Sequence, residues 1–99
     1  MILVRNVFRL KYGKAREAVA VMKESLELQK RAGFEGSARL LTDVTGPLYT
    51  LVLELTAPNM AYFETTMPRV FGTPEFRANH DKFVPLVESG TREIFTIVE

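Results

Sequence analysis

The fold is decided by the stretch ILVRNVFRL, residues 2–10, whose alternating β-branched and aromatic residues predict a β-strand. One side of this strand would carry the apolar residues Ile2, Val4, Phe8 and Leu10. The other side would carry Leu3 and Val7, which is unusual, because a strand with one solvated face alternates cleanly between apolar and polar residues. We therefore expect both faces of this strand to be covered.

The rest of the chain supplies three helical segments and three more strands. The spacing of apolar residues predicts a helix over 14–32 that ends at Gly33, then strands over 37–44 and 48–56 joined by Thr45-Gly46-Pro47. A second helix would begin at Pro58 and be kinked or shortened by Pro68. A third would run from an N-cap at Thr73 to about Glu88, bent by Pro85, before a final strand over 91–98. The order βαββαβ, with a broken second helical segment, predicts a ferredoxin-like α+β fold with a four-stranded antiparallel sheet. We expect residues 1–99 to form one such domain.

The sheet face away from the helices would be apolar as well. If Leu3, Val7, Val52 and Ile94 all pointed to this face, water would contact a larger apolar patch than a monomer normally exposes. We therefore predict a homodimer in which two chains pack sheet to sheet as a dimeric α+β barrel.

Charged residues also belong to this face, namely Arg5, Arg9 and Glu54, with Arg39 and Asp43 in phase with each other on the second strand. These charges could pair across the dimer or reach its solvated rim, or they could form an anion site inside the barrel.

Composition excludes several classes of function. Thirteen Lys and Arg against twelve Asp and Glu give a net charge of +1, which provides no field for nucleic acid or an anionic membrane. An RNA-recognition module shares this sheet, but its stacking positions would hold Leu3 and Val52 instead of aromatic residues. The absence of Cys and the single His80 argue against a metal site. Met1 leads directly into the first strand and no apolar run is long enough for a membrane span, so we expect a cytoplasmic protein.

Two polar residues are candidates for a site between sheet and helices. The stripe Phe76, His80, Phe83 and Val87 would point His80 toward the sheet, where it is either a hydrogen-bonded core residue or a general base or axial ligand. Asn6 interrupts the apolar face of the first strand, so it needs hydrogen-bonding partners or faces a pocket. Tyr49, in phase with Leu51 and Leu53, would add a hydroxyl to the same layer.

These features together resemble the dimeric α+β barrel superfamily. The residues that carry the resemblance are Asn6 to Leu10, Gly13-Lys14, the long helix that follows, and Phe76-Arg77-Ala78-Asn79-His80. The chain is similar to the antibiotic biosynthesis monooxygenase group, which includes small haem-degrading monooxygenases, and to NIPSNAP-like proteins.

The resemblance implies roles for particular residues. Asn6 and His80 match two pocket residues of the haem-degrading members, but those members have a Trp about where Val70 and Phe71 stand, and this chain has no Trp. Cofactor-free members use a base and an oxyanion donor on an aromatic or quinol substrate, which would be His80 and Asn6 here. Tyr49 and Tyr62 would orient the substrate, with Phe76 and Val70 beside it.

Three functions therefore stay open. The first is a small-molecule-binding protein that acts as a cofactor-independent monooxygenase on an aromatic or quinol-type substrate. The second is a non-enzymatic ligand-binding or assembly protein of the NIPSNAP-like type, and the third is a haem-binding or haem-degrading monooxygenase. We expect a small apolar or aromatic ligand and no cofactor, with haem as the alternative.

Overall fold

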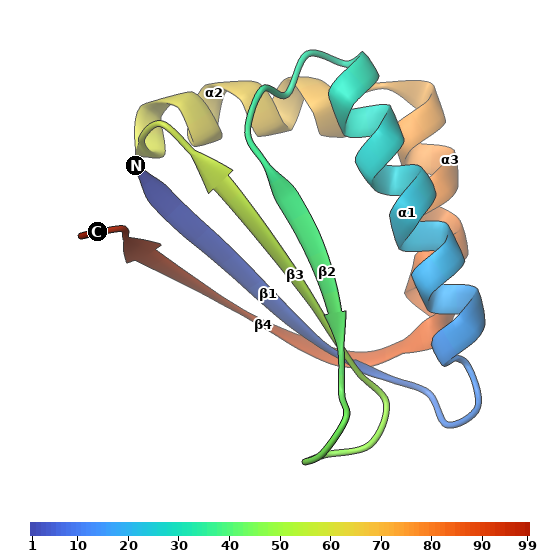
Figure 1. The fold of residues 1–99 in the computed structure, drawn as a ribbon. Coiled ribbons are helices and arrows are strands. Elements are labelled where there is room, and N and C mark those ends of the chain that lie inside the picture. Colours follow the sequence, from blue (N-terminus) through green and yellow to red (C-terminus); the bar gives the residue numbers. More distant parts are fainter.

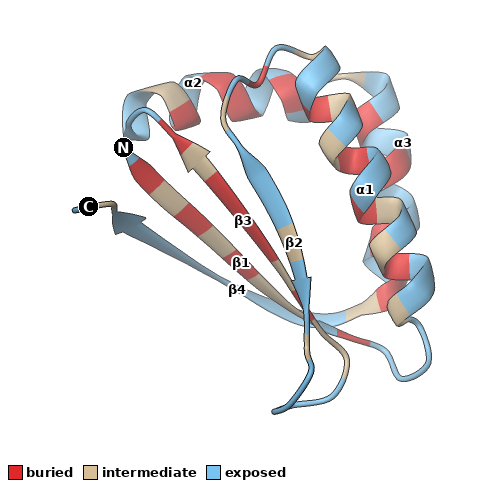
Figure 2. Ribbon diagram, in the orientation of Figure 1, coloured by how far each residue is buried: buried red, intermediate tan, exposed pale blue.

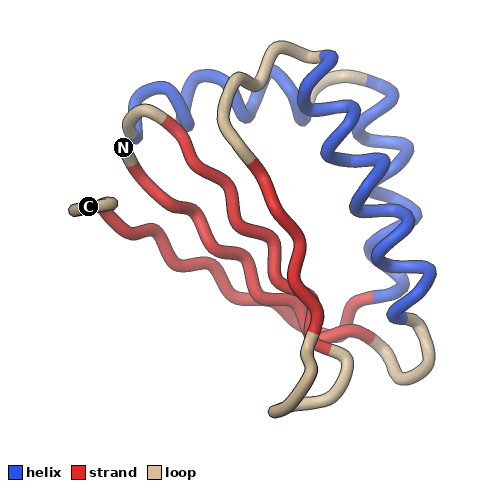
Figure 3. Tube along the Cα trace, in the orientation of Figure 1, coloured by secondary structure: helices blue, strands red, loops and turns tan.

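The computed structural model describes residues 1–99 and contains four strands and three α-helices (Figures 1 and 3). The strands are β1 (Ile2–Leu10), β2 (Ala38–Thr42), β3 (Thr50–Ala57) and β4 (Val87–Thr96). The helices are α1 (Ala15–Arg31), α2 (Met60–Phe71) and α3 (Pro74–Phe83), and a 3₁₀ turn, η1 (Val84–Leu86), follows α3. Every helix is too short or too polar to span a bilayer.

The four strands form one sheet in the order β2-β3-β1-β4, in which all neighbours are antiparallel. The helices lie on one side of this sheet, and α1 and α3 run beside each other (Figure 1). This arrangement confirms the predicted ferredoxin-like α+β fold. The backbone N–H of Ile97 donates to the carbonyl of Met1, so the two ends of the chain are close together.

The core lies between the sheet and the helices, and its strand residues come from the two central strands. Buried and partly exposed residues alternate along most of β1, buried residues predominate in β3, and β2 and β4 are mostly exposed (Figure 2). Val4, Leu51 and Val70 are the largest side chains that are fully buried. The predicted bounds of the first strand are confirmed, and the first helix begins and ends within one residue of its prediction.

The end of the third helix differs from the prediction. We expected a helix to about Glu88, closed by Ser89-Gly90, but α3 ends at Phe83 and residues 87–90 already belong to β4. Pro85 accounts for this, because it has no N–H to continue the helix and only the short turn η1 accommodates it. Gly90 then passes over the ring of Phe8, where a Cβ atom would lie 3.1 Å from a ring carbon.

The two strands of the hairpin formed by β2 and β3 are also shorter than predicted. The loop extends over residues 43–49, and the Asp43 carboxylate accepts a hydrogen bond from the backbone N–H of Thr50 at 2.9 Å. Tyr49 has a φ of 60°, which ends the extended backbone. Pro68, which we expected to kink or shorten its helix, lies inside α2, which continues to Phe71.

The helices leave one face of the sheet uncovered, and we call it the open face. Two cross-strand pairs of apolar residues lie on it. Val7 pairs with Val52 in register, and Leu3 pairs with Phe95. Ile94, which we predicted for this face, pairs with Val4 and therefore lies on the helix side. The prediction had no register for this strand, and the observed pairing with β1 places Ile94 on the face of Val4 and Phe95 on the face of Leu3.

A row of charges crosses the same open face. The guanidinium of Arg5 donates to Glu54 at 2.9 Å, and that of Arg39 lies 2.7 Å from the other carboxylate oxygen. These charges therefore pair within one chain, although we had expected pairing across the dimer or with solvent. The hydrogen bond from Arg39 lowers the pKa of Glu54 below its ordinary value of 4.5, burial opposes this shift, and the hydrogen bond from Arg5 adds to it.

This lowered pKa predicts how stability depends on pH. Because the folded pKa of Glu54 lies below the unfolded one, the ionised carboxylate adds stability above the unfolded pKa, and this stability is lost as pH falls through the folded pKa. Urea unfolding at one protein concentration, from pH 6 to pH 3, should show a smaller loss of unfolding free energy in Glu54→Gln than in the wild type. Glu64→Gln, at an exposed position, should follow the wild type. Equal pH profiles for wild type and Glu54→Gln would contradict the assignment.

Candidate functional site

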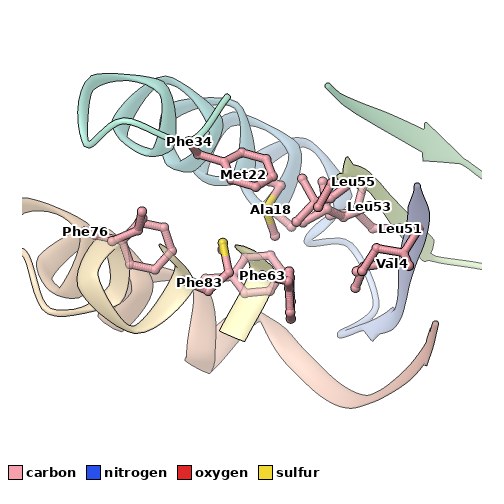
Figure 4. Close-up of a cluster of buried hydrophobic side chains, with 14 of the residues drawn as sticks. Val4, Ala18, Met22, Phe34, Leu51, Leu53, Leu55, Phe63, Phe76 and Phe83 are labelled. Atoms are coloured by element: carbon pink, nitrogen blue, oxygen red, sulfur yellow. The ribbon is translucent and has the colours of Figure 1, made fainter. Parts of the chain in front are cut away.

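A cavity of about 550 Å³ lies between the sheet and the helices. It is lined by 17 residues, of which ten are hydrophobic: Phe8, Val21, Met22, Leu53, Leu55, Phe63, Met67, Phe71, Phe76 and Phe83. Figure 4 shows several of these side chains, from α1, β3, α2 and α3, gathered in one interior. The volume is within the roughly 300–1,000 Å³ that is typical of small-molecule pockets, and so is the excess of apolar lining.

Seven polar residues complete the cavity wall. They are Ser25 and Gln29 from α1, Arg77, Asn79, His80 and Asp81 from α3, and Arg92 from β4. No group of three or more His, Cys, Asp and Glu residues could hold a metal ion. The wall is therefore an apolar surface with a few separate polar groups.

Asn79 occupies the buried position on α3 that we had assigned to His80. Only 2% of Asn79 is exposed, and its side-chain amide donates to the carbonyl of Val21 on α1 at 2.9 Å. Its Oδ1 atom is buried and has no hydrogen-bond partner. Exchanging the nitrogen and the oxygen would place Oδ1 against the Val21 carbonyl, so the contact with α1 fixes the orientation of the amide.

His80 is exposed and lies at the edge of the site. It lines the cavity, and its ring is nearly parallel to that of Phe76, with 6.5 Å between the centroids. The contact of Asn79 with α1 rotates the helix so that Phe76, Asn79 and Phe83 face inward. Spacing within the helix could not distinguish this rotation from one that buries His80, because residues three and four apart share a face.

Asn6 is buried on the helix side of the sheet, but it does not line the cavity. Its Oδ1 atom accepts a hydrogen bond of 2.7 Å from Nε of Arg92, which is its register partner on β4. The guanidinium carbon of Arg92 lies 5.8 Å from the centroid of the Phe63 ring. Sequence reasoning missed Arg92. The sequence does contain one indication of its place. Arg92 stands two residues before Ile94, so the two side chains share a face of β4, and the register of β4 shows that this is the helix side.

The other predicted site residues are dispersed. Phe76 lines the cavity beside His80, whereas Val70 is fully buried elsewhere in the core. Tyr49 packs against Tyr12 at the end of the hairpin, with 4.6 Å between ring centroids. The hydroxyl of Tyr62 accepts a hydrogen bond from the backbone N–H of Glu35.

Comparison with sequences gives no relative, since neither a protein-family model nor a curated protein sequence matches the chain. Solved structures do match it. A NIPSNAP domain protein from Burkholderia xenovorans superposes with a TM-score of 0.87 at 17% identity, covering 99% of this chain and 95% of that one. A putative antibiotic biosynthesis monooxygenase from Nitrosomonas europaea gives a TM-score of 0.77 at 13% identity, covering 100% of both chains.

A third similar structure is a mutant form of SnoaB, a cofactor-independent oxygenase from Streptomyces nogalater. Its TM-score is 0.76 at 15% identity, with 99% of this chain and 93% of that chain covered. Identities this low show a shared fold and no more. The sheet order, the helical layer and these superpositions together show that the chain has the fold of the NIPSNAP and antibiotic biosynthesis monooxygenase-like proteins, as the resemblance in its sequence predicted.

Proposed function

We propose that the chain binds a small apolar or aromatic molecule in the cavity between its sheet and its helices. The observation that carries this proposal is the cavity itself, whose aromatic and aliphatic wall is interrupted by a few polar groups. Burial of a ring against Phe63, Phe76 and Phe83 would supply the free energy of binding. The polar residues would then select the orientation of the ligand.

Binding can be measured with N-phenyl-1-naphthylamine, a neutral aromatic probe that fluoresces in apolar sites. The wild type should bind the probe, and Ser25→Phe, which places a ring into the cavity, should weaken binding at least tenfold. Ala20→Phe adds the same ring at an exposed position of α1 and should bind like the wild type. Absence of probe binding to the wild type, or equal binding by both variants, would remove the proposal.

The partner that best fits the open face of the sheet is a second copy of the chain. Val7, Val52, Leu3 and Phe95 lie there without cover, and Phe95 is 41% exposed. Glu54 is already paired within the chain, so a covering surface would meet paired charges instead of an isolated carboxylate. A homodimer that packs sheet to sheet would bury these residues as a dimeric α+β barrel.

Sedimentation velocity tests the dimer. Val52→Lys places a cation in the middle of the open face and should shift the protein from dimer to monomer at micromolar concentration. Val44→Lys makes the same change in the hairpin loop, where Val44 is 96% exposed, and should leave the dimer intact. A wild type that sediments as a folded monomer would refute this assembly.

A second candidate function is that of a cofactor-independent monooxygenase, with the non-enzymatic binding protein as its alternative. The position of His80 in the cavity wall favours it, since a base beside an aromatic ligand is what proton abstraction needs. A haem site does not fit as well, because Asn6 is engaged by Arg92 and does not line the cavity. We therefore assign no cofactor to this function.

The chemistry balances without a cofactor. His80 would take a proton from an activated CH₂ carbon of a phenolic substrate, and the electron pair left on that carbon would reduce O₂. One oxygen atom would remain on the carbon as a carbonyl, and the other would leave as water with the two hydrogens of the CH₂ group. The developing oxyanion would need a hydrogen-bond donor, and Arg92 lines the cavity with N–H groups to offer.

Oxygen uptake with 1,8-dihydroxy-9-anthrone as substrate distinguishes enzyme from binder. The wild type should accelerate uptake above the uncatalysed rate, and His80→Ala should reduce that acceleration by about 100-fold or more, as for the loss of a general base. Glu75→Ala, at an exposed position of α3 outside the cavity wall, should retain the dimer and most of the rate. If the wild type does not accelerate oxygen uptake but still binds the probe, the monooxygenase function is contradicted and the non-enzymatic ligand-binding function remains.

A further inference from the structure

Arg92 is a cation in the cavity wall that no carboxylate neutralises. The salt bridges of the structure involve Arg5, Arg39 and Lys82, and none involves Arg92. Arg92 is an exposed residue of β4, so its guanidinium lies where the cavity meets solvent and a ligand entering the cavity can reach it.

Two contacts hold this guanidinium in place. Nε donates to Asn6, and the planar group lies near the face of Phe63. Both terminal amino groups of Arg92 remain for a ligand, in the fork geometry that matches the two oxygens of a carboxylate or a similar anion. The buried amide of Asn6, which interrupts an otherwise apolar strand face, thus has a structural reason: it orients Arg92.

The other charged residues of the wall leave this cation in excess. Arg77 and Arg92 carry two positive charges and Asp81 carries one negative charge, so these three residues together contribute a net charge of +1. Arg77, Asp81 and Arg92 are all exposed, so this charge lies where the cavity meets solvent, and it attracts anions to that opening. An apolar cavity with one arginine that has no carboxylate partner is therefore suited to a ligand that has both an apolar part and a negatively charged group.

We propose that the ligand of this cavity is an amphipathic anion, with an aromatic or aliphatic body and one oxyanion group that pairs with Arg92. Asn6 is a positioning residue in this site, acting through Arg92. The inference rests on the proposed ligand-binding function and adds the charge and the orientation of the ligand to it. The oxyanion would lie at the β4 side of the cavity, and the apolar body would extend toward α3.

Two probes that differ in charge test the proposal. The first, 1-anilinonaphthalene-8-sulfonate, carries a sulfonate, and N-phenyl-1-naphthylamine is its neutral counterpart with the same rings. The wild type should bind the anion more tightly than the neutral probe. Arg92→Gln should weaken anion binding about tenfold or more, the typical effect of losing a charge-assisted hydrogen bond, and should change neutral binding less than twofold.

Asn6→Asp tests the positioning role with little change in shape. An aspartate at this site keeps an acceptor for Nε of Arg92 but neutralises its charge, so preference for the anion should fall to that of Arg92→Gln. Arg9→Gln removes a cation from the opposite face of β1, where its guanidinium contacts Thr50, and should keep the wild-type preference.

The outcomes separate this inference from the function on which it rests. If the wild type does not bind the neutral probe, the ligand-binding function itself fails. If both probes bind but Arg92→Gln keeps the preference for the anion, the anion site is refuted and the binding function stands. If Ser25→Phe weakens only the neutral probe, the anion binds outside the cavity, which also refutes the proposal.

Discussion

The pairing of β1 between β3 and β4 is the constraint on which the rest of the structure depends. Successive side chains of a strand point to opposite faces, so the register of this one strand decides what both sides of the sheet present. On the helix side it brings Asn6 opposite Arg92, and on the open side it brings Arg5 beside Glu54. A shift by one residue would expose Val4, bury Arg5 among the helices and remove both pairings.

Local signals in the sequence were sufficient for the fold but not for the site. Three such signals act over a few neighbouring residues: the alternation over residues 2–10, the helical spacing of α1 and the capping residue Thr73. The strand, the helix and the N-cap that they predict are all confirmed. The choice between Asn79 and His80 depends instead on a hydrogen bond between α3 and α1, which lie 58 residues apart at this contact. The pairing of Arg92 with Asn6 joins positions 86 residues apart and depends on the register of β4 against β1.

Asn79 serves both the cavity and the helices that cover it. Its buried Oδ1 atom accepts no hydrogen bond from the chain, and it belongs to a residue of the cavity wall, so it is left for a polar group inside the cavity. The same residue ties α3 to α1, which lets two helices that rest against each other keep a hollow between themselves and the sheet. The polar side chain therefore belongs to the architecture of the cavity as well as to its lining.

The hydrogen bond between Ile97 and Met1 has a consequence for engineering the chain. Because the first and last strands are neighbours, a short peptide could connect residues 1 and 99 without crossing any other element (Figure 1). New ends could then be opened in the exposed loop over residues 43–49. Such a circularly permuted chain would begin with β3 and end with β2, and it would keep the same neighbours for every strand.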